Sequence, residues 1–319
     1  MLLGDTFDFT LVEHGGRRLD ATPAGALVRL ERIATAHAGV FAALRRVACA
    51  GVALDVVPGN HDLELLSPIV TRRLQAMLTA DGGSLTLHPW IIHVPGLAHL
   101  EHGQQHHDLN RVPGLLGAGD VDELPLLAGT VYGEHLLALA DVLGADVPIE
   151  RLSARALAAT ARRRPARLRA AIAPSIGALA RLTRCERAAR RARPPLERVQ
   201  RAAHGLPPVT VGALERASAT TPASALRRVL ARASEPYMVR AARTTHELLA
   251  GAGCAVPFYV LAHTHAAEDR SLTQAAGDPR YLNAGTWSRL APTGARRQCY
   301  VELRDNGGAP SAQLLDWPA

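Results

Sequence analysis

The stretch VALDVVPGNHD, residues 52–62, changes within a few positions from an apolar run to a polar loop. Its first six residues are rich in valine, and a short continuous apolar run of this kind is typical of a strand buried on both faces. Glycine, asparagine and aspartate in the second half are typical of a loop. We therefore predict a buried strand over residues 52–57 that ends in a polar loop.

The sequence on either side of this stretch alternates between helix and strand patterns. Residues 22–51 have helical periodicity, with Thr22 as a cap, Pro23 in the first turn and Gly51 at the end. A second helix begins at the Ser-Pro pair of SPIVTRRLQAMLTA, and SLTLH and WIIHV resemble strands. This alternation favours an α/β layered fold.

The carboxyl-terminal part of the chain repeats the pattern of a buried strand followed by polar residues. VPFYVLAHTH, residues 256–265, is an apolar run that ends in two histidines, and RYLNAGTWS follows it. Further on, DNGG is a plausible hairpin turn between RQCYVELR and SAQLLDW. We predict one domain built from residues 1–111 and 251–319, interrupted by a helical insertion at residues 112–250.

The predicted insertion is strongly basic. The chain has 319 residues and 36 Lys plus Arg, all of them arginine, and residues 151–250 hold 21 arginines against 5 acidic residues. Nucleic acid or anionic lipid could bind such a segment, but basic faces are usually only solvated, and this one lacks interleaved aromatic residues for stacking. We do not favour these partners, and a cap over an active site is an equally compatible role.

The cysteines and the hydropathy pattern indicate where the protein resides. The four cysteines form no CxxC pair and show no zinc-ligand spacing, which suits a reducing compartment. No signal sequence is evident, and the most apolar stretch, residues 123–147, is interrupted by Glu134 and Asp141. We expect a cytoplasmic protein without a transmembrane segment.

Four short polar clusters follow strand-like segments: GDTFD at residues 4–8, GNHD at 59–62, EHG at 101–103 and AHTH at 262–265. Loops at the carboxyl ends of strands meet at one edge of an α/β sheet, so these clusters are expected to converge. Imidazole, carboxylate and amide groups suit divalent metals. A single histidine is more often a packed or surface residue than a metal ligand, so the prediction depends on the ordered combination of the four clusters. We predict a metal cage formed by Asp5, Asn60, His102, His263 and His265.

LLGDTFD, VPGNHD, EHG and LAHTH, followed by YLNAGTW, resemble in this order the motifs of calcineurin-like metallophosphoesterases. The resemblance covers about residues 1–111 and 250–319. It implies an α/β fold with a two-sheet sandwich flanked by helices, in four layers, and a dinuclear centre of Mn, Fe or Zn at the strand ends. Ala262 stands where the family usually has glycine, a change that we expect to be tolerated.

The same resemblance assigns a role to each candidate residue. Asp5 would bridge the two metals. Asn60, His102 and His263 would complete the second metal site, and His265 would bind the first metal. His61 would be the catalytic histidine that assists the leaving group. The implied activity is the hydrolysis of a phosphomonoester or phosphodiester, a phosphorylated substrate, by a metal-activated water.

One family motif is missing from the sequence. An Asp-x-His motif should precede GDTFD, but Asp5 lies four residues after Met1, and MLL is too short for an ordinary strand. We therefore expect an N-terminally truncated fold with a weak first-metal site. A start downstream of the true one is favoured over a decayed relative. The alternative function is a catalytically impaired metal-binding module whose basic insertion binds an anionic partner.

Several neighbours of the predicted cage receive supporting or neutral roles. We expect Asp8 and Asp62 to orient loops or imidazoles. Asn283 and Trp287 are expected to shape the strand beside the site, with Trp287 packed in the core. Five further residues are expected to be solvated loop residues: Glu101, His106, His107, Asp108 and Asn110.

Overall fold

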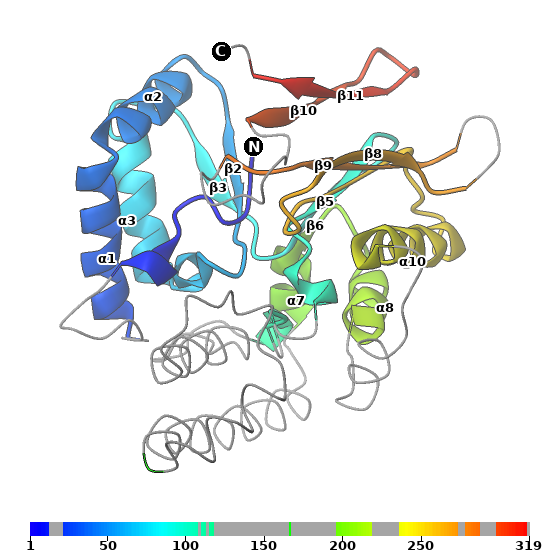
Figure 1. Cartoon of the computed structure of the whole chain (residues 1–319), viewed down its shortest axis with the longest axis horizontal. Coiled ribbons are helices and arrows are strands. Elements are labelled where there is room, and N and C mark those ends of the chain that lie inside the picture. Colours follow the sequence, from blue (N-terminus) through cyan, green and yellow to red (C-terminus); the bar gives the residue numbers. More distant parts are fainter. Residues whose placement is uncertain are drawn as a thin grey trace.

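The structure is a computed structural model, and it describes residues 1–12, 22–107, 110–112, 115–117, 166, 196–218, 236–273, 278–287 and 298–317. These residues form a mixed α/β fold with six α-helices and three sheets (Figure 1). The predicted α/β class is confirmed.

A three-stranded parallel sheet contains β1 (Leu2–Leu3), β2 (Leu54–Val57) and β3 (Leu85–Leu87), in that order. The strands predicted at residues 52–57 and 84–88 are thus present, with slightly shorter bounds. β1 has only two residues, and Leu2 pairs with Val56. A short pairing suffices to direct the chain into residues 4–8 beside the end of β2.

One face of this sheet is covered by α1 (Pro23–Ala36), α2 (Ala38–Cys49) and α3 (Pro68–Thr79) (Figure 1). The Thr22 hydroxyl accepts a hydrogen bond from Gly25 N at 3.1 Å, so the predicted cap is confirmed. The prediction of one continuous helix to residue 51 was wrong. His37 leaves the helical region, at φ −117° and ψ 36°, and the chain divides there into two helices.

The second sheet has six strands, in the order β6-β4-β5-β7-β9-β8. β5 pairs in parallel with β7, and β7 with β9, while β4 and β8 are antiparallel to their neighbours β5 and β9. The carboxyl ends of β5, β7 and β9 therefore lie at the same edge. The bounds are β4 (Ile91–Val94), β5 (Ala98–Glu101), β6 (Ala203–His204), β7 (Phe258–Leu261), β8 (Ala267–Ser271) and β9 (Arg280–Ala284).

Alternate residues of β7 point into two different apolar cores, because successive side chains of a strand face opposite ways. Tyr259 and Leu261 pack with α7 (Leu196–Ala202), α8 (Pro208–Ser218) and α10 (Tyr237–Gly251). Phe258 and Val260 pack in the core that contains Val57 of β2. The three-stranded sheet thus faces the six-stranded sheet across one core, and helices cover the outer face of each sheet.

β10 (Cys299–Arg304) and β11 (Ser311–Asp316) form an antiparallel hairpin (Figure 1). Its residue Ala312 is buried in the core between the two sheets. Its turn contains the DNGG sequence, and the predicted hairpin is confirmed. The prediction that Trp287 packs in the core was wrong. Trp287 is 56% exposed and lies beside the ring of Trp317, with centroids 5.7 Å apart.

Residues of the predicted insertion reach the second sheet. α7, α8 and α10 all begin within residues 112–250, and Met238, Ala242 and Leu249 of α10 are buried against the six-stranded sheet. Most of the arginine-rich remainder lies outside the described residues. The division of the chain into a domain and an insertion stays a prediction.

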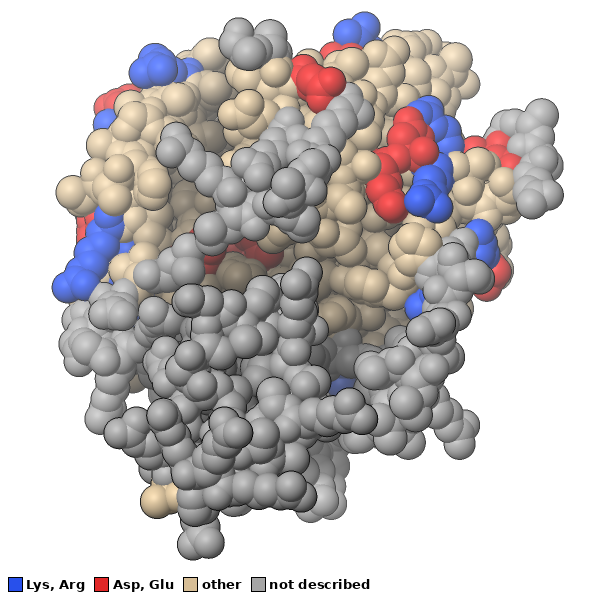
Figure 2. All heavy atoms as spheres, viewed as in Figure 1, with Lys and Arg blue, Asp and Glu red and all other residues tan. Residues whose placement is uncertain are grey.

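Charge on the described surface is mixed in sign. Figure 2 shows small groups of basic and acidic side chains on one face. Pairs such as Arg270 with Glu268, and Arg304 with Glu302, bring opposite charges together on single strands. Within the described part of the chain, no helix has both the length and the apolar character needed to cross a membrane.

Candidate metal centre

The polar clusters predicted to converge come from both sheets. β1 and β2 are parallel, and their carboxyl ends lead into residues 4–8 and 58–62. β5 and β7 lead into the loops that begin at His102 and Ala262, and Ala262 N donates a hydrogen bond to His102 O at 2.9 Å. Since Leu3 and Val57 pack in the same core as Leu100, the ends of the two sheets meet at one edge.

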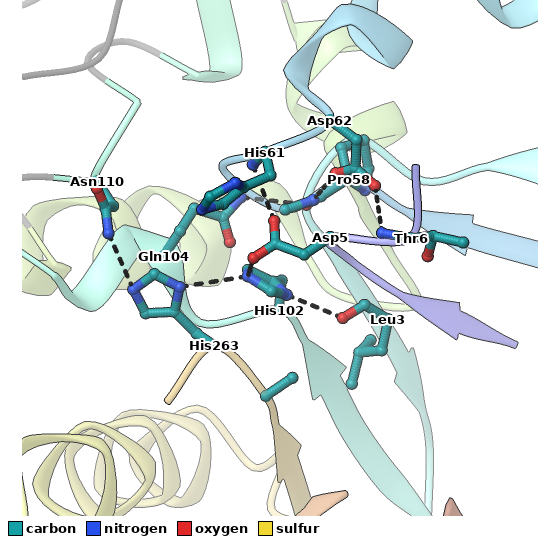
Figure 3. A network of polar contacts seen from close by, with 12 residues as sticks. Leu3, Asp5, Thr6, Pro58, His61, Asp62, His102, Gln104, Asn110 and His263 are labelled. Atoms are coloured by element: carbon teal, nitrogen blue, oxygen red, sulfur yellow. Dashed lines mark hydrogen bonds and ion pairs between the residues drawn. The ribbon is translucent and has the colours of Figure 1, made fainter. Parts of the chain in front are cut away.

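At this edge Asp5, His102 and His263 point toward one another (Figure 3). Each offers one ligand atom, and all three atoms lie within 4.8 Å of one another. His102 Nε2 is 3.1 Å from Asp5 Oδ2 and 3.3 Å from His263 Nδ1. One carboxylate and two imidazole nitrogens at this spacing can share a divalent cation such as Zn²⁺ or Mn²⁺.

Contacts on the far side of each ring orient the two imidazoles. His102 Nδ1 donates to Leu3 O at 2.9 Å, and this places the proton on Nδ1 and leaves Nε2 as the donor atom for a metal. His263 Nε2 faces the Asn110 carboxamide at 3.4 Å (Figure 3). If the Asn110 amide is rotated by 180°, its oxygen can accept a hydrogen bond from His263 Nε2–H. His263 Nδ1 would then carry no proton and could bind a metal.

Three of the five predicted ligands have unusual backbone geometry. Asp5, His263 and His265 have φ values of 50°, 69° and 60°, in the left-handed region that residues other than glycine adopt only with strain. Such conformations persist where the surrounding structure enforces them, and they cluster at functional sites. Two of these residues, Asp5 and His263, belong to the three-residue group.

Two glycines allow the loops to approach this closely. A Cβ atom on Gly59 would lie 2.1 Å from Asp5 Oδ1, and one on Gly4 would lie 2.2 Å from His102 Nδ1. Side chains at either position would therefore overlap with groups of the centre. Packing therefore requires glycine at both positions, and Gly4, at φ 79°, also has a backbone conformation that favours glycine.

Asn60 provides a test of whether a metal fits. It is 8% exposed, and its Oδ1 is buried without a hydrogen-bond partner among the described residues. The next residue, His61, donates its backbone N–H to Asp5 Oδ1 at 2.8 Å, so the Asn60 loop lies against the Asp5 carboxylate. A buried amide oxygen without a donor is unfavourable unless something binds it, and a divalent cation is a suitable partner.

The charged groups of the centre shift one another's pKa values. Burial alone would raise the pKa of Asp5, but the charge and hydrogen bond of His102 outweigh it and hold that pKa well below its usual range. Burial, followed by the charge of His102, lowers the pKa of His263 to about 2. The ionised Asp5 carboxylate and the neutral His263 imidazole are in the protonation state that metal coordination needs. Burial lowers the pKa of His102, but the charge and hydrogen bond of Asp5 outweigh it and raise that pKa, so a metal would displace a proton from His102 Nε2.

His61 lies beside the three-residue group rather than in it. Its Nδ1 donates to Asp8 Oδ1 at 3.1 Å, and the Thr10 hydroxyl also contacts Asp8. Burial lowers the pKa of His61, but the hydrogen bond to Asp8 and the charges of Asp5, Asp8 and Asp62 raise it to about 9. His61 is therefore protonated at neutral pH and can donate a proton. The orienting role predicted for Asp8 is confirmed.

Asp62 ties the first two loops together. It is fully buried, and its carboxylate accepts hydrogen bonds from Thr6 N, at 2.8 Å, and from Gly59 N. Burial, followed by repulsion from Asp5, raises the pKa of Asp62 to about 6. The predicted loop-orienting role is confirmed.

His265 is half-buried and lies outside the three-residue group. Burial lowers its pKa, and the negative charge of Asp5 only partly opposes this shift. It follows His263 by two residues in a loop where both have positive φ. Its assignment to a first metal stays a prediction.

The expectation that Glu101 is a solvated loop residue was wrong. Glu101 is 1% exposed, and its carboxylate accepts from Trp90 Nε1 and His106 Nε2, both at 2.9 Å. His106, His107 and Asn110 are half-buried rather than exposed, and Asp108 lies outside the described residues. Because Glu101 directly precedes His102, these bonds fix the start of the loop that carries a ligand.

Gln104 helps to hold the loops of the candidate centre together, and the sequence did not indicate this role. It is 1% exposed, and its Nε2 donates to Pro58 O at 3.2 Å, directly before Gly59 (Figure 3). This bond joins the loop after β5 to the loop after β2. No periodicity in EHGQQHHD indicates it, since the partner is a backbone carbonyl of another sheet.

Comparisons with protein-family models, with curated proteins and with solved structures found no match for this chain.

Proposed function

We propose that this protein is a metal-dependent phosphoesterase that hydrolyses a phosphomonoester or phosphodiester. The observation that carries the proposal is the convergence of Asp5, His102 and His263 at one sheet edge, with the buried and unpartnered Oδ1 of Asn60 in the adjoining loop. These four residues come from four separate segments that resemble, in order, the motifs of calcineurin-like metallophosphoesterases.

The arrangement of the sheets supports the same family. Two sheets face each other across one core, and helices pack on their outer faces. That is the layering expected of a metallophosphoesterase-like four-layer fold. We propose this fold for the chain together with the activity.

The proposed centre assigns distinct tasks to the chain's own residues. Divalent cations, when bound, supply Lewis-acid polarisation of phosphoryl oxygens and lower the pKa of water, which provides a nucleophile at neutral pH. Asp5, Asn60, His102 and His263 would hold one cation, and Asp5 with His265 would hold a second, weaker one. Mn, Fe and Zn suit these nitrogen and oxygen ligands.

His61 would complete the reaction as the general acid. Its Nδ1 is held by Asp8, so its Nε2 is the nitrogen available to a substrate. A protonated His61 would donate that proton to the leaving alkoxide as the bond from phosphorus to oxygen breaks. The ion pair with Asp8 keeps the ring charged and oriented between turnovers.

Hydrolysis assays on the full purified chain test the proposal. We expect hydrolysis of p-nitrophenyl phosphate or bis-p-nitrophenyl phosphate to require added Mn²⁺, Fe²⁺ or Zn²⁺ and to stop with EDTA. His102→Ala should abolish it, because His102 contacts both Asp5 and His263. The matched control is His37→Ala, which changes an exposed histidine between two helices and should leave the rate unchanged.

The second candidate function is a catalytically silent metal-binding module. One specific observation favours it. Within the described residues, only one group of His, Cys, Asp and Glu side chains could hold a metal ion, and that group has three members. A single cation held there could stabilise the sheet edge without supporting hydrolysis. The arginine-rich segment would then bind an anionic partner, as the composition suggests.

Metal analysis separates the two candidates. Near two ions per chain, with metal-stimulated hydrolysis of either ester, would favour the phosphoesterase. One ion per chain that raises the unfolding temperature, with no hydrolysis of either ester under any of the three metals, would favour the silent module and refute the enzyme. Loss of the bound ion in His102→Ala, but not in His37→Ala, would place it at the proposed centre.

A further inference from the structure

Asn283 of β9 is completely buried, and its side chain reaches the loop that carries His263 and His265. We propose that Asn283 is a positioning residue that holds this loop in the conformation that presents the two histidines to a metal. The inference rests on the metal binding proposed above, but it does not require hydrolysis.

The contacts of Asn283 bracket His263 on both sides. Its Nδ2 donates to Ala262 O at 2.9 Å and to Thr264 Oγ1 at 3.0 Å, so one amide group touches the residue before His263 and the residue after it. Nδ2 also lies 3.0 Å from Tyr281 Oη. A single side chain thereby ties two points of the histidine loop to the neighbouring strand.

The orientation of the amide follows from its other end. Asn283 Oδ1 accepts a hydrogen bond from Gly285 N at 2.8 Å. A backbone N–H can only donate, so the oxygen must face Gly285 and the NH₂ group must face the loop. Because the loop partner Ala262 O can only accept, both ends of the amide agree on one orientation.

The histidine loop needs such a restraint. His263 and His265 both have positive φ, and a loop with two residues in this region relaxes unless other contacts hold it. Its backbone is held by Thr264 N donating to Ala262 O at 2.8 Å, and by Ala262 N donating to His102 O. Asn283 adds the hydrogen bonds that connect this turn to β9.

The structure also explains why asparagine suits this position. Aspartate would keep the acceptor for Gly285 N but would present a second acceptor to Ala262 O. An apolar residue would leave Gly285 N and the loop carbonyl without these partners in a buried environment, which is unfavourable. Only a side chain with an acceptor at one end and donors at the other serves both strand and loop.

Zn²⁺ affinity tests the inference. Affinity of the full chain is measured by competition with a chromogenic chelator, with His102→Ala as the background for sites elsewhere. We expect Asn283→Ala to weaken Zn²⁺ binding at the centre about 10-fold to 100-fold, the effect usual for residues that orient metal ligands.

A second pair of variants guards against misfolding of Asn283→Ala. Thr264→Val removes only the hydroxyl that Asn283 contacts, and we expect it to weaken Zn²⁺ binding about 10-fold. Thr264→Ser keeps the hydroxyl and should bind as the wild type does. Unfolding in EDTA should be nearly unchanged for both, because Thr264 is only half-buried.

The matched control is Asn306→Ala. Asn306 Nδ2 also bridges a loop, donating to Ala309 O and Ser311 Oγ at 3.3 Å, but this loop joins β10 and β11. Its loss should not change Zn²⁺ affinity.

If Asn283→Ala and Thr264→Val bind Zn²⁺ as tightly as the wild type, the positioning role is refuted and the proposed metal centre is not. A wild type whose Zn²⁺ binding equals that of His102→Ala would refute both this inference and the proposed centre.

Discussion

Gly59→Ala is expected to disrupt the candidate centre through packing alone. The added Cβ would lie 2.1 Å from Asp5 Oδ1, 2.5 Å from Asp5 N and 2.8 Å from Asp5 Cγ, whereas ordinary contact begins at 3.4 Å. Gly59 and Asp5 must therefore separate by about 1 Å, and overpacking of this kind costs about 1–3 kcal/mol of unfolding free energy. Since two of the three crowded atoms belong to the Asp5 carboxylate, the metal ligand itself is displaced.

The change is informative because Gly59, unlike Gly4, does not have a positive φ, so the loss comes from steric overlap and not from backbone preference. We expect urea unfolding in EDTA to show the destabilisation and Mn²⁺ titration to show weakened binding. The matched control is Gly39→Ala in α2, where a Cβ meets nothing within 4 Å. That variant should gain roughly 0.4–1 kcal/mol of unfolding free energy and leave Mn²⁺ binding unchanged.

One pair of results would refute this reasoning. If Gly59→Ala unfolds at the same urea concentration as the wild type and binds Mn²⁺ equally well, then the loops do not approach as closely as described. A loss of stability with unchanged Mn²⁺ binding would refute Asp5 as a ligand. A loss of both is the expected result.

Two further predictions concern protonation. Burial, followed by the neighbouring His99, lowers the pKa of His93 from 6.5 to about 4, so His93 stays neutral in the folded chain while the unfolded chain takes up a proton as pH falls. We therefore compare the unfolding free energy in EDTA near pH 7 with its value at about pH 5. The decrease should be about 2 kcal/mol larger in the wild type than in His93→Phe. Equal losses would contradict this. His61→Asn should lower kcat for phenyl phosphate about 10²-fold to 10⁴-fold. It should lower kcat for p-nitrophenyl phosphate much less, because nitrophenolate leaves without needing a proton. Similar losses of kcat for the two esters would exclude His61 as the general acid.

Local sequence patterns predicted several elements of the fold. The apolar run at residues 52–57, the Thr22 cap and the DNGG turn each depend on residues close to one another in the chain, and each is present. The break at His37 was not predictable in this way, since the sequence there has neither proline nor a turn motif. In the structure α1 and α2 both pack against α3, which is a tertiary contact that no local pattern shows.

The surroundings of the site were less predictable than its members. Glu101 lies in a short polar sequence that is typical of a solvated loop, yet it is buried because Trp90 and His106 donate to its carboxylate. Trp90 directly precedes β4, and His106 lies in the turn after β5. Hydrogen bonds to residues on other elements leave no period in the sequence that could reveal them.

The sequence by itself determined the chemical groups of the candidate centre and their order along the chain, because residue types and strand-to-loop transitions are local properties. Only the tertiary structure decided that Asp5, His102 and His263 meet within 4.8 Å, and that Asn60 Oδ1 is buried without a partner among the described residues. The physical reason is that these distances depend on how two sheets pack across a shared core. That packing is the sum of many apolar contacts, and it joins residues as far apart in the chain as Leu3 and Leu282.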